Sequence, residues 1–242
     1  MLHGEQREQF NLSFGLPAEC ADRLAASEAD VGLVPCIELT RQRLAIIPGA
    51  GIACHGPVRS ILLVSKVPFD RIRTLAADSG SRTSVVLARL ILRRKYVSEP
   101  EVVSARPELP AMLENADACL IIGDPALLLD PGNLPFHVLD LGTEWTQMTG
   151  LPMVFAVWAA RSTFPVQDPA PLLDSLAYGM DRIDEIVAIE SPKRSVSPAL
   201  AKQYLTRNIV FRLGQAEYRG LDLFLEYAKQ LKIQYVATKV TA

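Results

Sequence analysis

Short apolar runs alternate with amphipathic segments along the chain. The runs 58–65 and 151–160 are apolar at nearly every position, which is typical of strands buried on both faces. Around the segment 16–29, a strand, a helix and a strand are expected in succession, an order that indicates an α/β fold with parallel strands. We expect strands at 11–14, 31–35, 58–65, 75–77, 101–104, 118–122 and 151–160, a strand and turn at 137–142, and helices at 16–29, 85–95, 107–115, 144–148, 170–190, 199–208 and 214–232.

One loop rich in hydroxyl groups opens directly into a helix. Residues 78–84 read DSGSRTS, and the segment that follows places Val86, Leu87, Leu90 and Ile91 on a single helical stripe. This spacing predicts a helix with one buried face. Basic residues near its far end suit the negative pole of the helix dipole.

The start of this helix is a candidate anion site. Ser79 or Ser81 is placed to cap the first turn. The unpaired N–H groups there, together with the hydroxyls of Ser81, Thr83 and Ser84, would suit a carboxylate or a phosphate. A capped helix with a purely structural role is the alternative interpretation.

The two long apolar strands bracket a segment of domain size, which predicts two lobes with a ligand cleft between them. One lobe would consist of residues 1–66 and 153–242, and the other of 67–152. The strand-end loops 35–38, 79–84 and 123–126 would converge at the cleft, since ligands of α/β sheets bind at such ends. Cys36 and Asp124 are therefore candidate lining residues, with an ordinary loop position and a local helix cap as the respective alternatives.

Composition and charge exclude several classes of protein. The formal net charge of -2 argues against a general nucleic-acid binder, and no apolar run has the length of a membrane span. The four cysteines form no CxxC pair and the three histidines have no ligand spacing, so we expect neither a metal site nor a disulfide framework. No signal peptide is visible.

An ordered set of motifs resembles the chorismate dehydratase family of the futalosine route to menaquinone. The similarity covers nearly all of residues 11–165, and the set is specific although each motif alone is weak. The motifs are ADVGLVPCIE at 29–38, GIA at 51–53 with GPVRS at 56–60, GSRTS at 80–84, IGDPA at 122–126, DLG at 140–142 with Trp145, and TGLPMVFAVW at 149–158.

The resemblance implies a type II periplasmic-binding-protein-like fold used as a cytoplasmic enzyme. The family eliminates water from chorismate to give 3-[(1-carboxyvinyl)oxy]benzoate, and no cofactor is expected. Carried over by motif, Ser60 would sit at the reacting part of the substrate, and Ser81, Arg82, Thr83 and Ser84 would hold a carboxylate. Gly123 and Asp124 would line the opposite part of the cleft, and Cys36 stands where the family commonly has serine. The protein would act as a monomer or a homodimer.

The sequence departs from the family pattern at its start. The family opens with a strand that carries a Tyr/Phe-Leu-Asn motif, and this chain begins after that point. We therefore expect the 242 residues alone to have low stability or activity. Three other readings remain open: a solute-binding protein for a small carboxylate, the dihydroxynaphthoate-forming sister enzyme, and a ligand-sensing domain.

Overall fold

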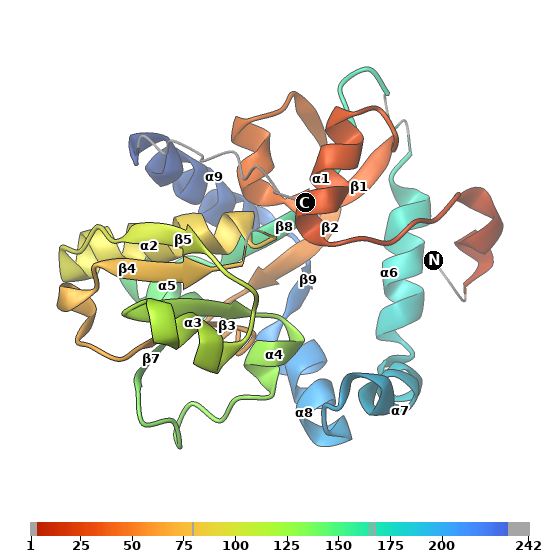
Figure 1. Ribbon diagram of the computed structural model, residues 1–242. Coiled ribbons are helices and arrows are strands. Elements are labelled where there is room, and N and C mark those ends of the chain that lie inside the picture. Colours follow the sequence, from red (N-terminus) through yellow and green to blue (C-terminus); the bar gives the residue numbers. More distant parts are fainter. Residues whose placement is uncertain (1–3, 79, 165, 167, 232–242) are drawn as a thin grey trace.

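The protein is built around two β-sheets, each with helices packed beside it (Figure 1). The computed structural model describes residues 4–78, 80–164, 166 and 168–231. The first sheet has the strand order β1 (Val31–Pro35), β8 (Met153–Arg161), β2 (Leu44–Cys54), β9 (Val210–Arg212). The second sheet has the order β5 (Glu101–Ser104), β4 (Thr74–Ala77), β6 (Ala118–Ile122), β3 (Ile61–Ser65), β7 (His137–Asp140).

Helices connect most of these strands. The C-terminal stretch is largely helical, and α9 returns to pack against β8 and α2. The α-helices are α1 (Pro17–Ala25), α2 (Arg82–Tyr96), α3 (Leu109–Asn115), α4 (Asp124–Leu127), α5 (Leu141–Thr149), α6 (Ala170–Met180), α7 (Ile183–Arg194), α8 (Pro198–Gln203) and α9 (Gln215–Gln230). Single turns of 3-10 helix lie at Glu5–Gln9, Cys36–Thr40 and Phe69–Arg71, and a π-helical turn lies at Tyr204–Asn208.

The parallel arrangement expected from the sequence is found only in part of the second sheet. There β4 pairs in parallel with both β5 and β6. In the first sheet β1 and β2 both run antiparallel to β8, and the predicted strand at 11–14 is irregular backbone. Phe14 in that segment is 73% exposed, so no buried face holds the segment in a sheet.

Strand β3 belongs to the second sheet, between β6 and β7. By sheet membership residues 61–65 therefore group with 67–152, whereas the sequence assigned them to the lobe formed by 1–66 and 153–242. The physical reason is that the backbone groups of the buried strand β3 need hydrogen-bond partners, which β6 supplies on one side and β7 on the other. The remaining lobe boundaries stay a prediction.

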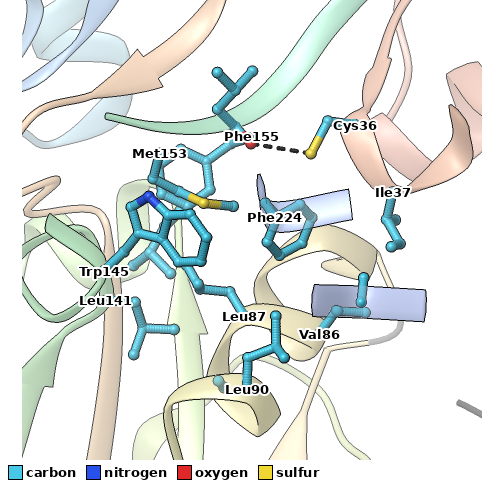
Figure 2. Packing of buried hydrophobic residues seen from close by; sticks show 14 of the residues in the cluster. Cys36, Ile37, Val86, Leu87, Leu90, Leu141, Trp145, Met153, Phe155 and Phe224 are labelled. Carbon is cyan, nitrogen blue, oxygen red and sulfur yellow. Dashed lines mark hydrogen bonds between the residues drawn. The ribbon is translucent and has the colours of Figure 1, made fainter. Parts of the chain in front are cut away.

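The apolar stripe of α2 lies at the centre of the largest core cluster, as the sequence predicted. Val86, Leu87, Leu90 and Ile91 are each no more than 1% exposed. They belong to one cluster with residues of both sheets and of α5 and α9. Figure 2 shows Leu87 facing the region where side chains from α5, β8 and α9 meet.

The C-terminal third differs from its expected pattern in three places. The helix expected at 170–190 is broken between Met180 and Ile183, because a new helix begins there with Asp184 and Glu185 in its first turn, where the dipole favours acids. The helix expected at 199–208 ends in the π turn. Strand β9, which the sequence did not indicate, is only three residues long.

Among the described residues, no helix combines the length and the apolarity needed to cross a bilayer.

Gly220 on α9 allows the helix to approach the loop before β8. A Cβ at this position would overlap the carbonyl oxygen of Pro152, the atom that accepts the indole N–H of Trp145 at 3.1 Å. We expect Gly220→Ala to lower the free energy of unfolding by about 2 kcal/mol, because the helix or the loop must shift. Urea unfolding measures this. Gly179→Ala on α6, where the nearest atom is 3.9 Å away, is the control and should be neutral or stabilising.

Candidate functional site

Three strand ends of the second sheet meet at one edge. Because β4 and β6 are parallel and β3 is antiparallel to β6, the ends of β4 and β6 lie beside the start of β3. The register pairs Ile61 with Ile122 and Ala77 with Leu120. Two strand spacings separate β4 from β3, or roughly 10 Å. The loops after Ala77 and Ile122 and the residue before Ile61 are therefore neighbours.

One side of this edge is formed by the start of α2 against the end of β1. The hydroxyl oxygen of Thr83 lies 3.7 Å from the Cys36 sulfur and accepts the backbone N–H of Ile37 at 3.4 Å. The Cys36 thiol, which has no exposed surface, donates to the carbonyl of Val154 at 3.0 Å (Figure 2). Cys36 and Thr83, both predicted site residues, are thus in contact.

The Arg82 side chain bridges three elements through ion pairs. Its guanidinium lies 3.2 Å from a carboxylate oxygen of Glu38 and 2.8 Å from one of Asp22. Glu38 is 1% exposed and also pairs with Arg41 at 2.8 Å. A buried carboxylate needs such partners, since an uncompensated charge there is costly. The part of Arg82 left for a substrate is its backbone N–H in the first helical turn, which has no partner within the helix.

Ser81 occupies the N-cap position of α2 without acting as a side-chain cap. The expected capping hydrogen bond is absent from its hydroxyl, which is buried and has no partner among the described residues. Its φ of −99° and ψ of 51° differ from the extended backbone that a capping serine adopts. The other candidate cap, Ser79, lies outside the described residues. Ser84 in the first turn is also buried.

The opposite side of the edge is the loop that leads to Ser60. Asp140, the N-cap of α5, accepts the backbone N–H groups of Val58 at 3.0 Å and Arg59 at 2.6 Å. Arg59 has a φ of 67° and its guanidinium donates to the carbonyls of Ala126 and Leu127 at the end of α4. A non-glycine residue in this region is held there by its surroundings. These contacts fix the backbone immediately before Ser60.

Ser60, Gly123 and Asp124 lie together. The N–H of Gly123 donates to the Ser60 carbonyl at 2.8 Å, and Gly123 has a φ of 69°, which favours glycine. The Ser60 hydroxyl lies 3.0 Å from the hydroxyl of Tyr204. The Asp124 carboxylate pairs with Arg194 on α7 at 2.9 Å.

A pocket of about 310 Å³ opens beside Asp124, between α4 and the C-terminal helices. Its wall is largely apolar, with the Asp124–Arg194 ion pair and the Tyr204 ring among the polar contributions. The Ser191 hydroxyl, buried in the same wall, has no hydrogen-bond partner among the described residues. The lining residues are Asp124, Leu127, Ile186, Val187, Glu190, Ser191, Arg194, Val196, Ala201, Tyr204 and Leu205.

The predicted site residues therefore form two groups at one sheet edge. Cys36, Ser81, Arg82, Thr83 and Ser84 make up the group at the start of α2, and Ser60, Gly123 and Asp124 make up the group beside the pocket. No hydrogen bond or ion pair between the two groups is found in the described part of the chain. Sequence reasoning missed Tyr204 and Arg194, because both lie in helical segments with no motif to mark them.

The chemistry of the site is that of neutral donors. Among the described residues no group of histidine, cysteine and acidic side chains could hold a metal ion. Burial raises the pKa of Cys36 to about 12, so its thiol is protonated at neutral pH. Burial likewise raises the pKa of the Tyr204 phenol. Hydroxyl and amide hydrogens are what the site offers to a ligand.

A family model described as menaquinone biosynthesis matches residues 1–230. The chain belongs to this menaquinone biosynthesis family. The resemblance carried by the sequence motifs is thereby confirmed at the level of the family. Among curated proteins, the chorismate dehydratase of Thermus thermophilus is 29% identical over 245 residues, covering 93% of this chain and 89% of that protein.

Solved structures show that this member of the menaquinone biosynthesis family has a periplasmic-binding-protein-like fold. A protein from Archaeoglobus fulgidus superposes with a TM-score of 0.71 at 19% identity, covering 91% of this chain and 85% of that one. The periplasmic aliphatic sulphonate binding protein of Escherichia coli superposes with a TM-score of 0.57 at 17% identity, covering 90% and 81%. The expected two-lobed α/β fold is confirmed.

We expect the ion pair between Arg82 and the buried Glu38 to stabilise the fold, although the Arg82 side chain is partly exposed. We expect Arg82→Met to lower the free energy of unfolding by about 2 kcal/mol, since Glu38 then keeps fewer partners in a buried position. Chemical denaturation at neutral pH measures this loss. The matched control is Arg89→Met on the same helix, for which no ion pair is found among the described residues; an equal loss in both variants would contradict the assignment.

The thiols should differ sharply in reactivity. Burial raises the pKa of all four thiols, but Cys20 is partly exposed whereas Cys36, Cys54 and Cys119 are buried. Because alkylation needs a thiolate that the reagent can reach, iodoacetamide should modify Cys20 in the native protein and the other three only after unfolding. Peptide mass spectrometry identifies the labelled positions. Rapid labelling of Cys36 in the native protein would contradict the buried, hydrogen-bonded thiol.

Proposed function

We propose that this chain is a chorismate dehydratase, which removes water from chorismate to give 3-[(1-carboxyvinyl)oxy]benzoate. The observation that carries the proposal is the sheet edge where Ser60, just before β3, lies beside the loop that runs from β4 to the hydroxyl-rich start of α2. Membership of the menaquinone biosynthesis family and the similarity to the Thermus thermophilus enzyme support the same activity.

The substrate is a dianion, and the start of α2 suits one of its carboxylates. N–H groups at a helix start and adjacent hydroxyls bind anions without burying an unpaired positive charge. Ser81 has a hydroxyl whose hydrogen-bonding capacity is unused among the described residues. In this proposal Ser81, Thr83 and Ser84 hold the carboxylate through hydroxyl and backbone donors. Arg82 supplies its N–H and steadies the helix start through Glu38.

The reaction is an elimination that makes the ring aromatic. A ring proton is removed from the carbon that carries the enolpyruvyl ether, the bond from the adjacent carbon to its hydroxyl breaks, and water leaves. No electrons are transferred to another molecule, and aromatisation supplies the driving force. We propose that the substrate's own side-chain carboxylate takes the proton, because both acidic side chains around the Ser60 loop are already engaged: Asp124 pairs with Arg194, and Asp140 accepts the N–H groups of Val58 and Arg59.

Ser60 is proposed to act on the leaving hydroxyl. Its backbone is fixed by the contact of the Arg59 N–H with Asp140 and by the Gly123 N–H. The position from which the Ser60 side chain extends is therefore fixed as well. A hydrogen bond from Ser60 to the departing oxygen strengthens as negative charge develops on that oxygen. Such a bond lowers the barrier more than it lowers the energy of the bound substrate. Gly123 and Asp124 then form the wall beside the reacting ring.

The experiment uses the natural protein, purified with every residue that its gene encodes, and chorismate as substrate. Chromatography with mass detection should show a benzoate product lighter than chorismate by one water. Ser60→Ala should lower kcat by about 100-fold, the range for loss of one transition-state donor, with a smaller change in KM. Ser162→Ala, an exposed serine after β8, is the control. Absence of product from the wild-type protein would overturn the proposal, and an unchanged kcat would remove Ser60 from the mechanism.

A further inference from the structure

The Tyr204 side chain, which comes from the C-terminal part of the chain, is hydrogen-bonded to Ser60. Its hydroxyl oxygen lies 3.0 Å from the Ser60 Oγ, within hydrogen-bond distance. Ser60 itself is 4% exposed, so the contact is shielded from bulk water. The Tyr204 ring also lines the pocket that contains Asp124 and Arg194. The phenol therefore joins the wall of the pocket to the Ser60 hydroxyl.

The backbone that carries Tyr204 is unusual. Helix α8 ends at Gln203, and Tyr204 begins a π turn closed by a hydrogen bond from the Ile209 N–H to the Tyr204 carbonyl at 3.1 Å. Such turns insert one residue into a helical path and occur frequently at functional sites. Asn208, at the far end of the turn, donates from its amide to the carbonyl of Pro57 at 2.8 Å. The π turn is therefore hydrogen-bonded to the loop that carries Ser60 at two places, by Tyr204 at Ser60 and by Asn208 at Pro57.

The chemistry of the two hydroxyls decides the direction of the hydrogen bond. Burial raises the pKa of Tyr204, so the phenol is neutral and keeps its proton at neutral pH. A phenol is a much stronger acid than an aliphatic alcohol and is the better donor of the pair. When Tyr204 donates to the Ser60 oxygen, the serine proton is free to point elsewhere. It is then available to a ligand at the sheet edge.

We propose that Tyr204 is a positioning residue: its phenol donates to Ser60 and thereby directs the Ser60 hydroxyl proton toward the hydroxyl that leaves chorismate. The inference rests on the proposed function. Neither residue changes its protonation state in this scheme. The ring proton passes to the substrate carboxylate, the carbon–oxygen bond breaks with its electron pair on oxygen, and that proton then joins the departing hydroxide to form water.

The competing arrangement would have Asp124 act on the same hydroxyl. The structure disfavours this, because the Asp124 carboxylate is engaged by Arg194, which also pairs with Glu190 at 3.6 Å. No hydrogen bond from Ser60 to Asp124 is found among the described residues, whereas the bond to Tyr204 is present. The side chain that is hydrogen-bonded to the Ser60 hydroxyl is therefore the phenol.

A double-mutant cycle tests whether Tyr204 acts through Ser60. The natural protein, Tyr204→Phe, Ser60→Ala and the double variant are compared for kcat and KM with chorismate. Tyr204→Phe should lower kcat by about 10-fold, the worth of one hydrogen bond, with less than about twofold change in KM. The double variant should be no slower than Ser60→Ala, because without Ser60 the phenol has nothing to direct.

The control and the outcomes separate this inference from the proposed function. Tyr218→Phe removes another hydrogen-bonded phenol, which accepts the N–H of Gly49 at 2.9 Å, and should leave kcat unchanged. Thermal unfolding of every variant confirms that the assays compare folded proteins. Turnover by the wild type with an unaffected Tyr204→Phe, or with multiplicative losses in the double variant, overturns the inference alone. No turnover by the wild type overturns the proposed function and this inference with it.

Discussion

The arrangement of the site depends on the burial of one helix face. Leu87 and Leu90 of α2 are buried in the same core cluster as Trp145 of α5 and Phe224 of α9, and so both sheets share a continuous apolar interior. On the outer side, Arg94 of α2 stacks over a ring of α9 at 3.5 Å. Rotation of α2 would expose several large side chains at once, each worth roughly 2 kcal/mol of burial. The start of α2 is therefore held at a fixed position relative to β1.

This constraint explains why polar groups without partners are tolerated near the sheet edge. An unsatisfied buried hydroxyl costs about 1–3 kcal/mol, yet the hydroxyls of Ser81 and Ser191 and the amide oxygen of Asn208 lack partners among the described residues. Such groups are rare in native proteins, and each one calls for an explanation. The stability that the apolar core contributes offsets this cost, because the core positions the backbone whether or not the polar groups have hydrogen-bond partners.

Structural features that follow from the periodicity of apolar residues were predicted correctly. Features that depend on pairing between distant segments of the chain were not. The stripe Val86, Leu87, Leu90 and Ile91 has a helical period that nothing else in the fold opposes, and all four are buried. The run 11–14 has the composition of a strand, but whether it pairs depends on a neighbour that local sequence does not encode. The grouping of 61–65 with the lobe of 1–66 and 153–242, although β3 belongs to the second sheet, has the same origin, because sheet membership is a long-range property.

Site residues show the same division between local and long-range information. Gly123 and Asp124 follow an apolar strand, at the kind of strand end where α/β sheets bind ligands, and Ser60 was assigned through the family motif. Tyr204 could not be found in this way, because a π turn has no sequence signature and its partner is 144 residues away. The phenol meets Ser60 only because the C-terminal helices return beside α4, where they line the pocket. Local patterns can therefore identify the residues offered to a ligand, but the groups that orient those residues depend on how distant segments pack.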